Sequence, residues 1–298
     1  MPPSKLSEQL SRDETIIAPG VFDAFSAASA EQAGFEAAYL SGASIAYCRF
    51  GRPDIGLVSM REVAETISEI RERVELPLLV DADTGFGNAL NVQRTVKLFE
   101  RNGASCIQLE DQTLPKRCGH LSGKTLVSAS EAVGKIKAAI DARDSDETLI
   151  MARTDAIAVE GFEAALDRGE RYLEAGADIL FIEAPNDEAE MKALTSRFKD
   201  RVPLLANMVE GGFTPMFDVE KLAAIGYRVV IFPGGLVRAR AHMEREYFAS
   251  LKANGWNKPF HDRMLDLKSL NETLGTADIL AAGAQYDAAN YDAENRDD

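Results

Sequence analysis

The sequence predicts an α/β fold, a (β/α)8 barrel of the TIM type followed by a helical C-terminal extension. Eight short apolar runs recur along the chain, helical patterns lie between them, and 298 residues are close to the usual barrel length of about 250. Most runs lack strict polar and apolar alternation, which is typical of parallel strands buried on both faces. The runs begin at Ile16, Ala37, Leu78, Cys106, Leu149, Ile179, Leu204 and Val229.

Helical stretches fill the connections between these runs. The phrases QAGFEAAYL, RNGASCIQL, EAGADILFI and AAIGYRVVI each place Gly shortly after a helix and before a strand. Gly adopts the left-handed conformation that helix C-termini often need, so these glycines indicate turns from helix to strand. The clearest helical stretches are residues 59–73, 90–101, 130–143, 162–174 and 219–224.

An open, doubly wound sheet is the main structural alternative. Such a sheet would carry a glycine fingerprint after its first strand, and the segment IIAPGVFDAF has none. After the eighth run, residues 241–286 have helical composition and give no further strand signal. Since no low-complexity linker divides the chain, we expect one domain over residues 1–298, with the extension from about residue 241 and a frayed tail at 289–298.

Composition narrows the expected partners and location. The 33 Lys and Arg residues against 48 Asp and Glu give a net charge of −15. This charge repels phosphate backbones and anionic membranes, so we expect no nucleic-acid or membrane partner. No uncharged run approaches the roughly 18 residues of a membrane span, and the first residues resemble no secretory signal. Three widely spaced cysteines argue against a disulfide scaffold, and together these features predict a cytoplasmic protein.

Polar and charged side chains follow most of the predicted strands. In a βα barrel the C-terminal strand ends meet at the mouth, where the chemistry of such enzymes takes place. Carboxylates crowded there without a cation would raise one another's pKa, and a hard divalent cation relieves that repulsion. With only three His in the chain, an oxygen-rich set of ligands predicts Mg²⁺ or Mn²⁺. The strand-end residues are Ser41, Asp81, Asp83, Glu110, Asp111, Arg153, Asp155, Glu183 and Asn207.

A long loop, EDQTLPKRCGHLSGK, follows the fourth predicted strand and sets Cys118 among cationic side chains. Loops of this length in compact barrels are often lids over an active site. Cationic neighbours favour the thiolate, which would make Cys118 a competent proton donor near neutral pH. The alternative is an inert cysteine in a basic surface loop with a solvated lysine, and for Cys48 and Cys106 the inert assignment is the expected one. The cationic residues are Lys116, Arg117, His120 and Lys124.

Four segments carry a resemblance to a known family: LLVDADTGFGNALNVQRTV, IQLEDQTLPKRCGH, IMARTDA and LLANMVEGG. Together they resemble the isocitrate lyase/phosphoenolpyruvate mutase superfamily, over most of the chain from APGVFDAFSA to FPGGLVRA. The resemblance implies a barrel whose eighth helix is exchanged between subunits, usually in a homotetramer, with Mg²⁺ at the mouth. It also implies that the substrates are small α-keto or α-hydroxy acids.

The KRCGH motif is similar to the branch of the superfamily that cleaves carbon–carbon bonds, whereas phosphonate-converting members typically carry Asn in this loop. The resemblance implies four metal ligands, namely Asp54, Asp81, Asp83 and Glu110. It implies substrate-binding groups at Ser41, Gly42, Ala43, Gly119, Arg153, Glu183 and Asn207.

Two departures distinguish the two branch members that the chain resembles. Members that act on 2-methylisocitrate tend to read SGGG where this chain reads SGAS. They carry Thr two positions after the shared Asn, where this chain has Val209. The segment NMVEGG therefore looks more like the 2,3-dimethylmalate lyase group.

We therefore expect a retro-aldol cleavage of a 2-hydroxy dicarboxylate or tricarboxylate to pyruvate, or another 2-keto acid, and a second carboxylic acid. Cys118 is the expected general acid, supported by Lys116, Arg117 and His120. The general base stays open between Tyr39 and Glu110. The alternatives are an oxaloacetate hydrolase or decarboxylase, an enzyme acting on phosphonopyruvate, and a barrel without catalytic activity.

Overall fold

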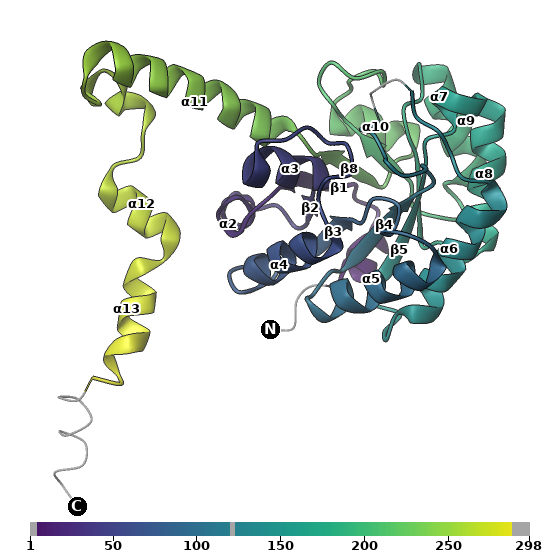
Figure 1. Cartoon of the computed structure of the whole chain (residues 1–298), viewed down its shortest axis with the longest axis horizontal. Helices are drawn as coiled ribbons and strands as arrows, with labels where there is room; N and C mark the ends of the chain where they lie inside the picture. Colours follow the sequence, from purple (N-terminus) through teal and green to yellow (C-terminus); the bar gives the residue numbers. More distant parts are fainter. Residues whose placement is uncertain (1–4, 120–122, 288–298) are drawn as a thin grey trace, which may run out of the picture. The chain divides into compact units, whose positions relative to one another are not determined.

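The computed structural model describes residues 5–119 and 123–287. Eight parallel strands form one sheet in the order β6-β5-β4-β3-β2-β1-β8-β7 (Figure 1). A parallel bridge between Leu180 and Leu204 joins the two ends of this order, so the sheet closes into a barrel. The strands are β1 (Ile16–Val21), β2 (Ala38–Leu40), β3 (Leu78–Asp81), β4 (Cys106–Glu110), β5 (Leu149–Thr154), β6 (Ile179–Ile182), β7 (Leu205–Asn207) and β8 (Val229–Phe232). The predicted (β/α)8 fold is confirmed.

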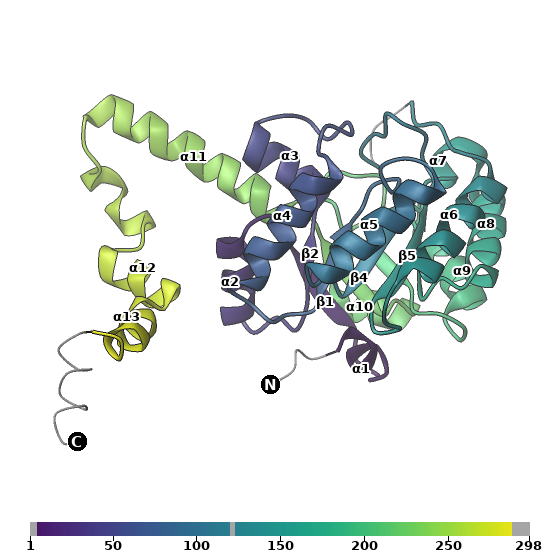
Figure 2. The same ribbon diagram turned by 60° about the horizontal axis from the view of Figure 1, so that its bottom comes forward.

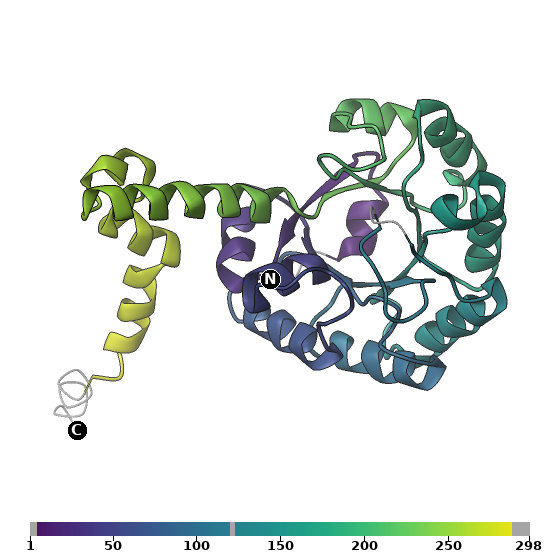
Figure 3. The same ribbon diagram turned by 45° about the horizontal axis from the view of Figure 1, so that its top comes forward.

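Helices surround the strands, as Figure 3 shows in a view toward one end of the barrel. Each of the five helical stretches predicted from the sequence coincides with a helix whose two ends agree within two residues. The helices before the last strand are α1 (Leu6–Leu10), α2 (Ala24–Gln32), α3 (Gly42–Phe50), α4 (Met60–Arg71), α5 (Ala89–Arg101), α6 (Ala129–Ala142), α7 (Ile157–Glu160), α8 (Phe162–Glu174), α9 (Glu188–Phe198) and α10 (Val219–Ile225).

The barrel has an apolar interior and an apolar layer between strands and helices. Inside, Tyr39, Met151 and Phe181 belong to one buried cluster fed by several strands. Leu6 of α1 joins this cluster, so α1 covers the N-terminal end of the strands (Figure 2). Burial on both faces explains why the strands read as continuous apolar runs in the sequence. The opposite end of the barrel is left for polar chemistry.

The chain divides into two compact units, Met1–Arg238 and Ala239–Asp298. The second unit is helical, and α11 (Gly235–Asn254) begins just before the boundary. It continues with a 3-10 helix η1 (Lys258–Arg263), α12 (Leu267–Leu274) and α13 (Thr276–Ala284). Within it, Phe260 is buried and packs edge-on against Tyr247, with 5.5 Å between ring centroids. The tail predicted to fray at 289–298 lies outside the described residues.

Membrane insertion finds no support in these elements. Among the helices in residues 5–119 and 123–287, none is both long and apolar enough to cross a bilayer.

Candidate active site

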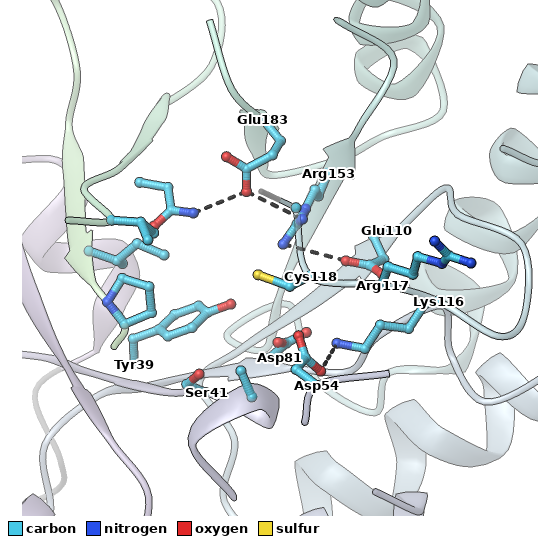
Figure 4. A pocket seen from close by; sticks show the side chains of 16 residues that line it. Tyr39, Ser41, Asp54, Asp81, Glu110, Lys116, Arg117, Cys118, Arg153 and Glu183 are labelled. Carbon is cyan, nitrogen blue, oxygen red and sulfur yellow. Dashed lines mark hydrogen bonds and ion pairs between the residues drawn. The ribbon is translucent and has the colours of Figure 1, made fainter. Parts of the chain in front are cut away.

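The C-terminal ends of the strands surround one pocket (Figure 4). Its lining brings together side chains that are far apart in the sequence, because every strand of a parallel barrel ends at the same rim. Acidic and basic groups dominate the part lined from β2 to β6, and apolar groups come from β7 and β8. The lining residues are Tyr39, Ser41, Ala43, Asp54, Asp81, Glu110, Lys116, Arg117, Cys118, Gly119, Arg153, Glu183, Asn207, Val209, Ile231 and Pro233.

One side of the pocket is an acidic cluster that surrounds the Lys116 ammonium group. Lys116 Nζ lies 2.5 Å from Asp54 Oδ1 and 2.7 Å from Asp83 Oδ1. Burial alone would lower the pKa of Lys116, but the carboxylates around it outweigh burial and raise that pKa well above its usual value. Lys116 therefore stays charged and partly neutralises the cluster.

Asp83 shows how strained this cluster is. Its backbone φ is 46°, a left-handed value that few residues other than Gly adopt and that is typical of functional sites. Burial raises the pKa of Asp83 to about 7, with Asp81 and Asp54 adding to the effect and Lys116 opposing it. The left-handed backbone and the buried charge of Asp83 therefore both destabilise the folded state at this position.

Asp81 is oriented by a buried amide that the sequence analysis did not identify. Gln108 Nε2 donates to Asp81 Oδ1 at 3.2 Å, and the backbone N–H of Asp83 donates to the same oxygen at 3.1 Å. Tyr39 donates its hydroxyl proton to Gln108 Oε1 at 3.0 Å. Burial and the nearby Asp81 carboxylate raise the pKa of Tyr39 well above its usual value. In this arrangement Tyr39 keeps its proton and acts as a hydrogen-bond donor.

Arg153 at the end of β5 connects the acidic cluster with β6. Its guanidinium binds Asp155 through Nε at 2.9 Å and Nη2 at 3.1 Å. It also lies 3.4 Å from Glu110 Oε2 and 3.3 Å from Glu183 Oε2. Glu183 Oε2 accepts a further hydrogen bond from Asn207 Nδ2 at 3.0 Å. Five side chains at the ends of β4, β5, β6 and β7 thus form one buried network at the rim. Figure 4 shows Glu110, Arg153 and Glu183 of this network.

Asp111 does not belong to the rim carboxylates, so counting it with them was wrong. Neighbouring residues on a strand point to opposite faces, and Glu110 already points into the barrel. Asp111 instead accepts from Tyr172 at 2.7 Å and from Thr154 at 2.6 Å, and it pairs with Arg168 at 3.1 Å. Its carboxylate therefore joins the strands to α8 rather than to the pocket.

The loop after β4 brings Cys118 to the pocket with its two neighbours, Arg117 and Gly119. The side chain of Gln112 makes two hydrogen bonds to the backbone of Arg117, at 3.0 Å and 2.8 Å. Lys124 is buried and pairs with Asp155, so the alternative interpretation of a solvated lysine is wrong. His120, which the sequence analysis placed beside Cys118, lies outside the described residues.

Apolar groups line the part of the pocket that comes from β7 and β8. Val209 follows β7, while Ile231 and Pro233 come from the end of β8. The carbonyl of Pro233 accepts a hydrogen bond from Ser44 Oγ at 3.1 Å. A Cβ atom at position 20 of β1 would overlap this carbonyl, so Gly20 allows the close approach of β1 and Pro233. This apolar wall has a fixed backbone position.

Apart from Asp111, the structure thus brings the sequence-predicted site residues within residues 5–119 and 123–287 to one place. Two of them, Gly42 and Asp83, lie just behind the lining: a Cβ at position 42 would lie 3.2 Å from Asp81 Oδ2, and Asp83 binds Lys116. Gly42 begins α3, whose N-cap Ser41 accepts from the backbone N–H of Ser44 at 3.2 Å. The first N–H groups of a helix have no partner within it, so this end of α3 suits an anion.

The oxygen donors of the pocket fit a hydrated divalent cation. In the described part of the chain, no group of three or more His, Cys, Asp or Glu is arranged to enclose a metal by itself. Mg²⁺ does not need such a group, because it usually binds one or two carboxylates and keeps several water ligands. Glu110 Oε1 is buried without a hydrogen-bond partner, and burial raises the pKa of Glu110 well above its usual value. A cation beside Asp81 and Glu110 would give Glu110 Oε1 a partner and would lower the raised pKa of this carboxyl group.

Comparison with known proteins agrees with this geometry. A family model described as phosphoenolpyruvate phosphomutase matches residues 6–252. The chain is 42% identical to 2,3-dimethylmalate lyase of Eubacterium barkeri over 95% of its own length and 97% of that protein. It is 44% identical to 2-methylisocitrate lyase of Aeropyrum pernix, over 92% of its own length and 87% of that protein.

Solved structures are similar over nearly the whole chain. An oxaloacetate acetylhydrolase bound to 3,3-difluorooxalacetate gives a TM-score of 0.90 at 33% identity, covering 96% of this chain and 98% of the other. A 2,3-dimethylmalate lyase gives a TM-score of 0.88 at 34% identity, covering 96% of this chain and 95% of the other. A phosphonopyruvate hydrolase in complex with oxalate and Mg²⁺ gives a TM-score of 0.85 at 32% identity, covering 95% of this chain and 98% of the other. The chain therefore belongs to the PEP mutase/isocitrate lyase superfamily, and the prediction of an enzyme of the lyase type is confirmed.

Proposed function

We propose that this enzyme cleaves the C2–C3 bond of a 2-hydroxy dicarboxylate of the 2,3-dimethylmalate type. The products are pyruvate, or another 2-keto acid, and a second carboxylic acid. The observation that carries this proposal is the composition of the pocket: an acidic cluster, Arg153 and Cys118 line the same space as an apolar wall. A small substrate with charged ends and alkyl substituents matches such a pocket.

Two groups supply the expected contacts with the substrate's carboxylates. The Arg153 guanidinium is planar and presents several donors, so it can bind a carboxylate through two hydrogen bonds, which a lysine cannot copy. The N–H groups at the start of α3 are the proposed second donor set, since Ser41 and Ala43 of this turn line the pocket. Glu183 and Asn207 hold Arg153 in place from the neighbouring strands.

Asp81 is the proposed direct ligand of Mg²⁺ or Mn²⁺, supported through water by Asp54, Asp83 and Glu110. When bound, the cation stabilises negative charge on the oxygen atoms of the substrate. The bound Mg²⁺ in the phosphonopyruvate hydrolase of similar fold is in keeping with this proposal. Lys116, which binds Asp54 and Asp83, holds these two carboxylates in place.

Cys118 is the proposed general acid. Loss of the hydroxyl proton from C2 and cleavage of the C2–C3 bond leave the electron pair on C3, as an enediolate. The Cys118 thiol gives its proton to C3, and nearby cationic groups, including Arg117, stabilise the anion before that transfer. Of the two candidate bases, Tyr39 retains its proton. Burial also raises the pKa of Glu110, and a cation beside it would lower that pKa and leave the carboxylate able to accept the hydroxyl proton, so Glu110 is the proposed base.

The apolar wall favours a dicarboxylate over a substrate with a third carboxylate. Val209, Ile231 and Pro233 offer no side-chain hydrogen bond to such a group. A buried carboxylate without a partner costs several kilocalories per mole, so a methyl group suits this wall better. This observation supports dimethylmalate ahead of methylisocitrate.

Hydrolysis of oxaloacetate is the second candidate, because an oxaloacetate acetylhydrolase has a TM-score of 0.90 to this chain. A panel assay separates the candidates: 2,3-dimethylmalate, 2-methylisocitrate, oxaloacetate and phosphonopyruvate are each supplied with Mg²⁺. We expect the highest kcat/KM for pyruvate release from dimethylmalate. Conversion of oxaloacetate alone, to oxalate and acetate, would establish the second candidate instead. No turnover of any substrate would indicate a barrel without catalytic activity.

We also propose that the chain is one functional domain that works in the cytoplasm as a homotetramer and exchanges its last barrel helix between subunits. In support, α12 and α13 have no buried residues, and Leu267, Ile279 and Leu280 are exposed. Large exposed apolar side chains on neighbouring helices are typical of surfaces that another chain covers. Light scattering would test the proposal: a mass near 32.4 kDa would contradict it.

A further inference from the structure

Lys124, which no step of the proposed reaction uses, is buried beside the pocket. Only 2% of its side chain is exposed, and its ammonium lies 2.8 Å from Asp155 Oδ1. The same ammonium donates to the backbone carbonyl of Gly119, the residue that follows Cys118. A buried lysine is costly unless each of its bonds is satisfied, so this position has a specific task.

Asp155 gives this lysine a rigid anchor. Its carboxylate is fully buried and also binds Arg153 through two hydrogen bonds, of 2.9 Å and 3.1 Å. Its backbone N–H donates to Asp111 Oδ1 at 3.0 Å, and Asp111 is bound in turn to α8 through Tyr172. The Lys124 ammonium is therefore fixed to the strand end, and so is the carbonyl that it binds.

Gly119 leaves the loop no room to shift toward the barrel. A Cβ atom at this position would lie 2.5 Å from Arg153 Nη2 and 2.7 Å from Glu183 Oε2. The loop backbone therefore rests directly on Arg153, which the proposed function assigns to substrate binding, and on Glu183, which holds Arg153 in place. Only glycine fits such a close approach.

The residue on the other side of Cys118 is held in the same manner. Gln112, 1% exposed, accepts from the backbone N–H of Arg117 at 3.0 Å and donates to its carbonyl at 2.8 Å. Gln112 is itself fixed at the end of β4 by a bridge to Leu126. Both peptide neighbours of Cys118 are thus bound by buried side chains that are not part of the pocket lining.

We propose that Gln112 and Lys124 form a two-sided clamp that fixes the Cys118 thiol over the reacting carbon. Both are positioning residues, because they act through the backbone on either side of the thiol. The proposal rests on the proposed function in one respect, the assignment of Cys118 as proton donor. The clamp itself is tested without a substrate.

The first test measures how fast iodoacetamide alkylates Cys118 in the full-length protein, by mass spectrometry. Lys124→Met and Gln112→Leu each remove one side of the clamp, so the loop leaves the pocket more often. We expect alkylation to be about tenfold faster in each variant. This is the factor in an equilibrium produced by losing one hydrogen bond from a charged group, as in Lys124→Met, or two uncharged ones, as in Gln112→Leu. Cys48 on α3 serves as an internal reference, and its rate should not change.

Lys135→Met is the matched control for the loss of a buried amine. Lys135 lies on α6 and donates to the carbonyl of Thr84 at 3.3 Å, away from the loop. The Lys135→Met variant should leave the alkylation rate of Cys118 unchanged. If Lys124→Met does not fold, Lys124→Gln keeps a donor, one bond shorter than lysine, and should show a smaller increase. Unchanged alkylation in both loop variants, or an equal increase in Lys135→Met, would overturn the clamp.

The second test uses the lyase assay and a double-mutant cycle. Gln112→Leu should lower kcat about tenfold and leave KM within about twofold, because it disturbs the thiol rather than Arg153. In the Cys118→Ser background, Gln112→Leu should lower kcat little further, because the thiol that it positions is already absent. If Gln112→Leu instead acted by a general loss of stability, its full effect on kcat would add to that of Cys118→Ser. Additive losses would overturn the clamp. If the wild type cleaves no diacid, the proposed function fails, and the alkylation rates still decide on the clamp.

Discussion

The part of the pocket formed by β3, β4 and β5 is charged and densely bonded, whereas the part formed by β7 and β8 presents mainly an apolar wall. In the charged part, Asp81, Lys116 and Arg153 each contact several neighbours. In the apolar part, Val209, Ile231 and Pro233 supply shape and exclude water. The charged part suits chemistry shared by many substrates, and the apolar wall suits the choice among them. Reaction type is therefore expected to change with the first part and substrate preference with the second.

Removal of the metal is the strongest way to disable the charged part. After exhaustive treatment with EDTA, we expect turnover to fall at least about a thousandfold, because a cation stabilises the developing charge by several kcal/mol. Mg²⁺ or Mn²⁺ should restore the rate, and Mg²⁺ should raise the melting temperature in the absence of substrate. Full activity in the metal-free protein would refute the cation site.

Cys118→Ser tests the proposed proton donor, which lines the same pocket as the charged part. We expect kcat to fall by at least about 100-fold, the usual effect of losing a general acid, with a small change in KM. Cys48→Ser on α3 changes a half-buried thiol outside the pocket and should leave kcat close to that of the wild type. Turnover of Cys118→Ser within a few-fold of wild type would remove the assignment.

Val209→Thr tests the apolar wall. Thr has nearly the shape of Val and adds a hydroxyl that can bind a third carboxylate. We expect the ratio of kcat/KM for methylisocitrate to that for dimethylmalate to rise about tenfold, a typical effect of one pocket contact. Val209→Ala controls for lost bulk and should not raise this ratio. The same ratio in all three proteins would contradict a selective wall.

The smallest expected effect concerns stability against acid. Burial disfavours the charged form of Asp155, yet Arg153 and Lys124 outweigh it and lower its pKa from 3.8 to about 2. A carboxylate whose pKa falls on folding stabilises the fold above its unfolded pKa, and the gain disappears as pH falls from about 4 toward 2. The shift corresponds to about 2 kcal/mol.

Urea unfolding at pH 5 and pH 2.5 measures that contribution. The free energy of unfolding of Asp155→Asn should lie below that of the wild type, and the gap should narrow by about 2 kcal/mol at the lower pH. Asp146→Asn changes a side chain that is 98% exposed and should show no such narrowing. A gap that is equal at both pH values would mean that the ion pairs of Asp155 do not set its pKa.

Most of the fold was predictable because parallel strands buried on both faces leave long apolar runs. The run at Leu78 and the strand Leu78–Asp81 begin at the same residue. The convergence of Asp81, Glu110 and Arg153 followed from the rule that strand ends share one rim. The prediction that Asp111 lies at the mouth was wrong, because side chains alternate along a strand and Asp111 is on the outer face of the barrel.

Contacts made through loops were less accessible to sequence reasoning. Lys116 and Asp54 are 62 residues apart and meet only because of the path of the loop after β4. Gln108 and Gln112 are uncharged amides inside or next to an apolar run, where nothing in the pattern separates an orienting amide from an ordinary buried one. Val209 was noted only as a departure from related sequences, and its place in the pocket lining emerged from the barrel geometry.

Gly20 lies on β1, is absent from the pocket lining, and is nevertheless in direct contact with the back of the Pro233 carbonyl. A methyl group added at Gly20 would displace that carbonyl and, with it, the proline that lines the pocket. The dimensions of the binding space are thus adjustable from behind, by a residue remote from every reacting atom. Any attempt to reshape the site for other acids therefore has to leave this glycine in place, or accept a shift of the Pro233 backbone and of the hydrogen bond that Ser44 makes to it.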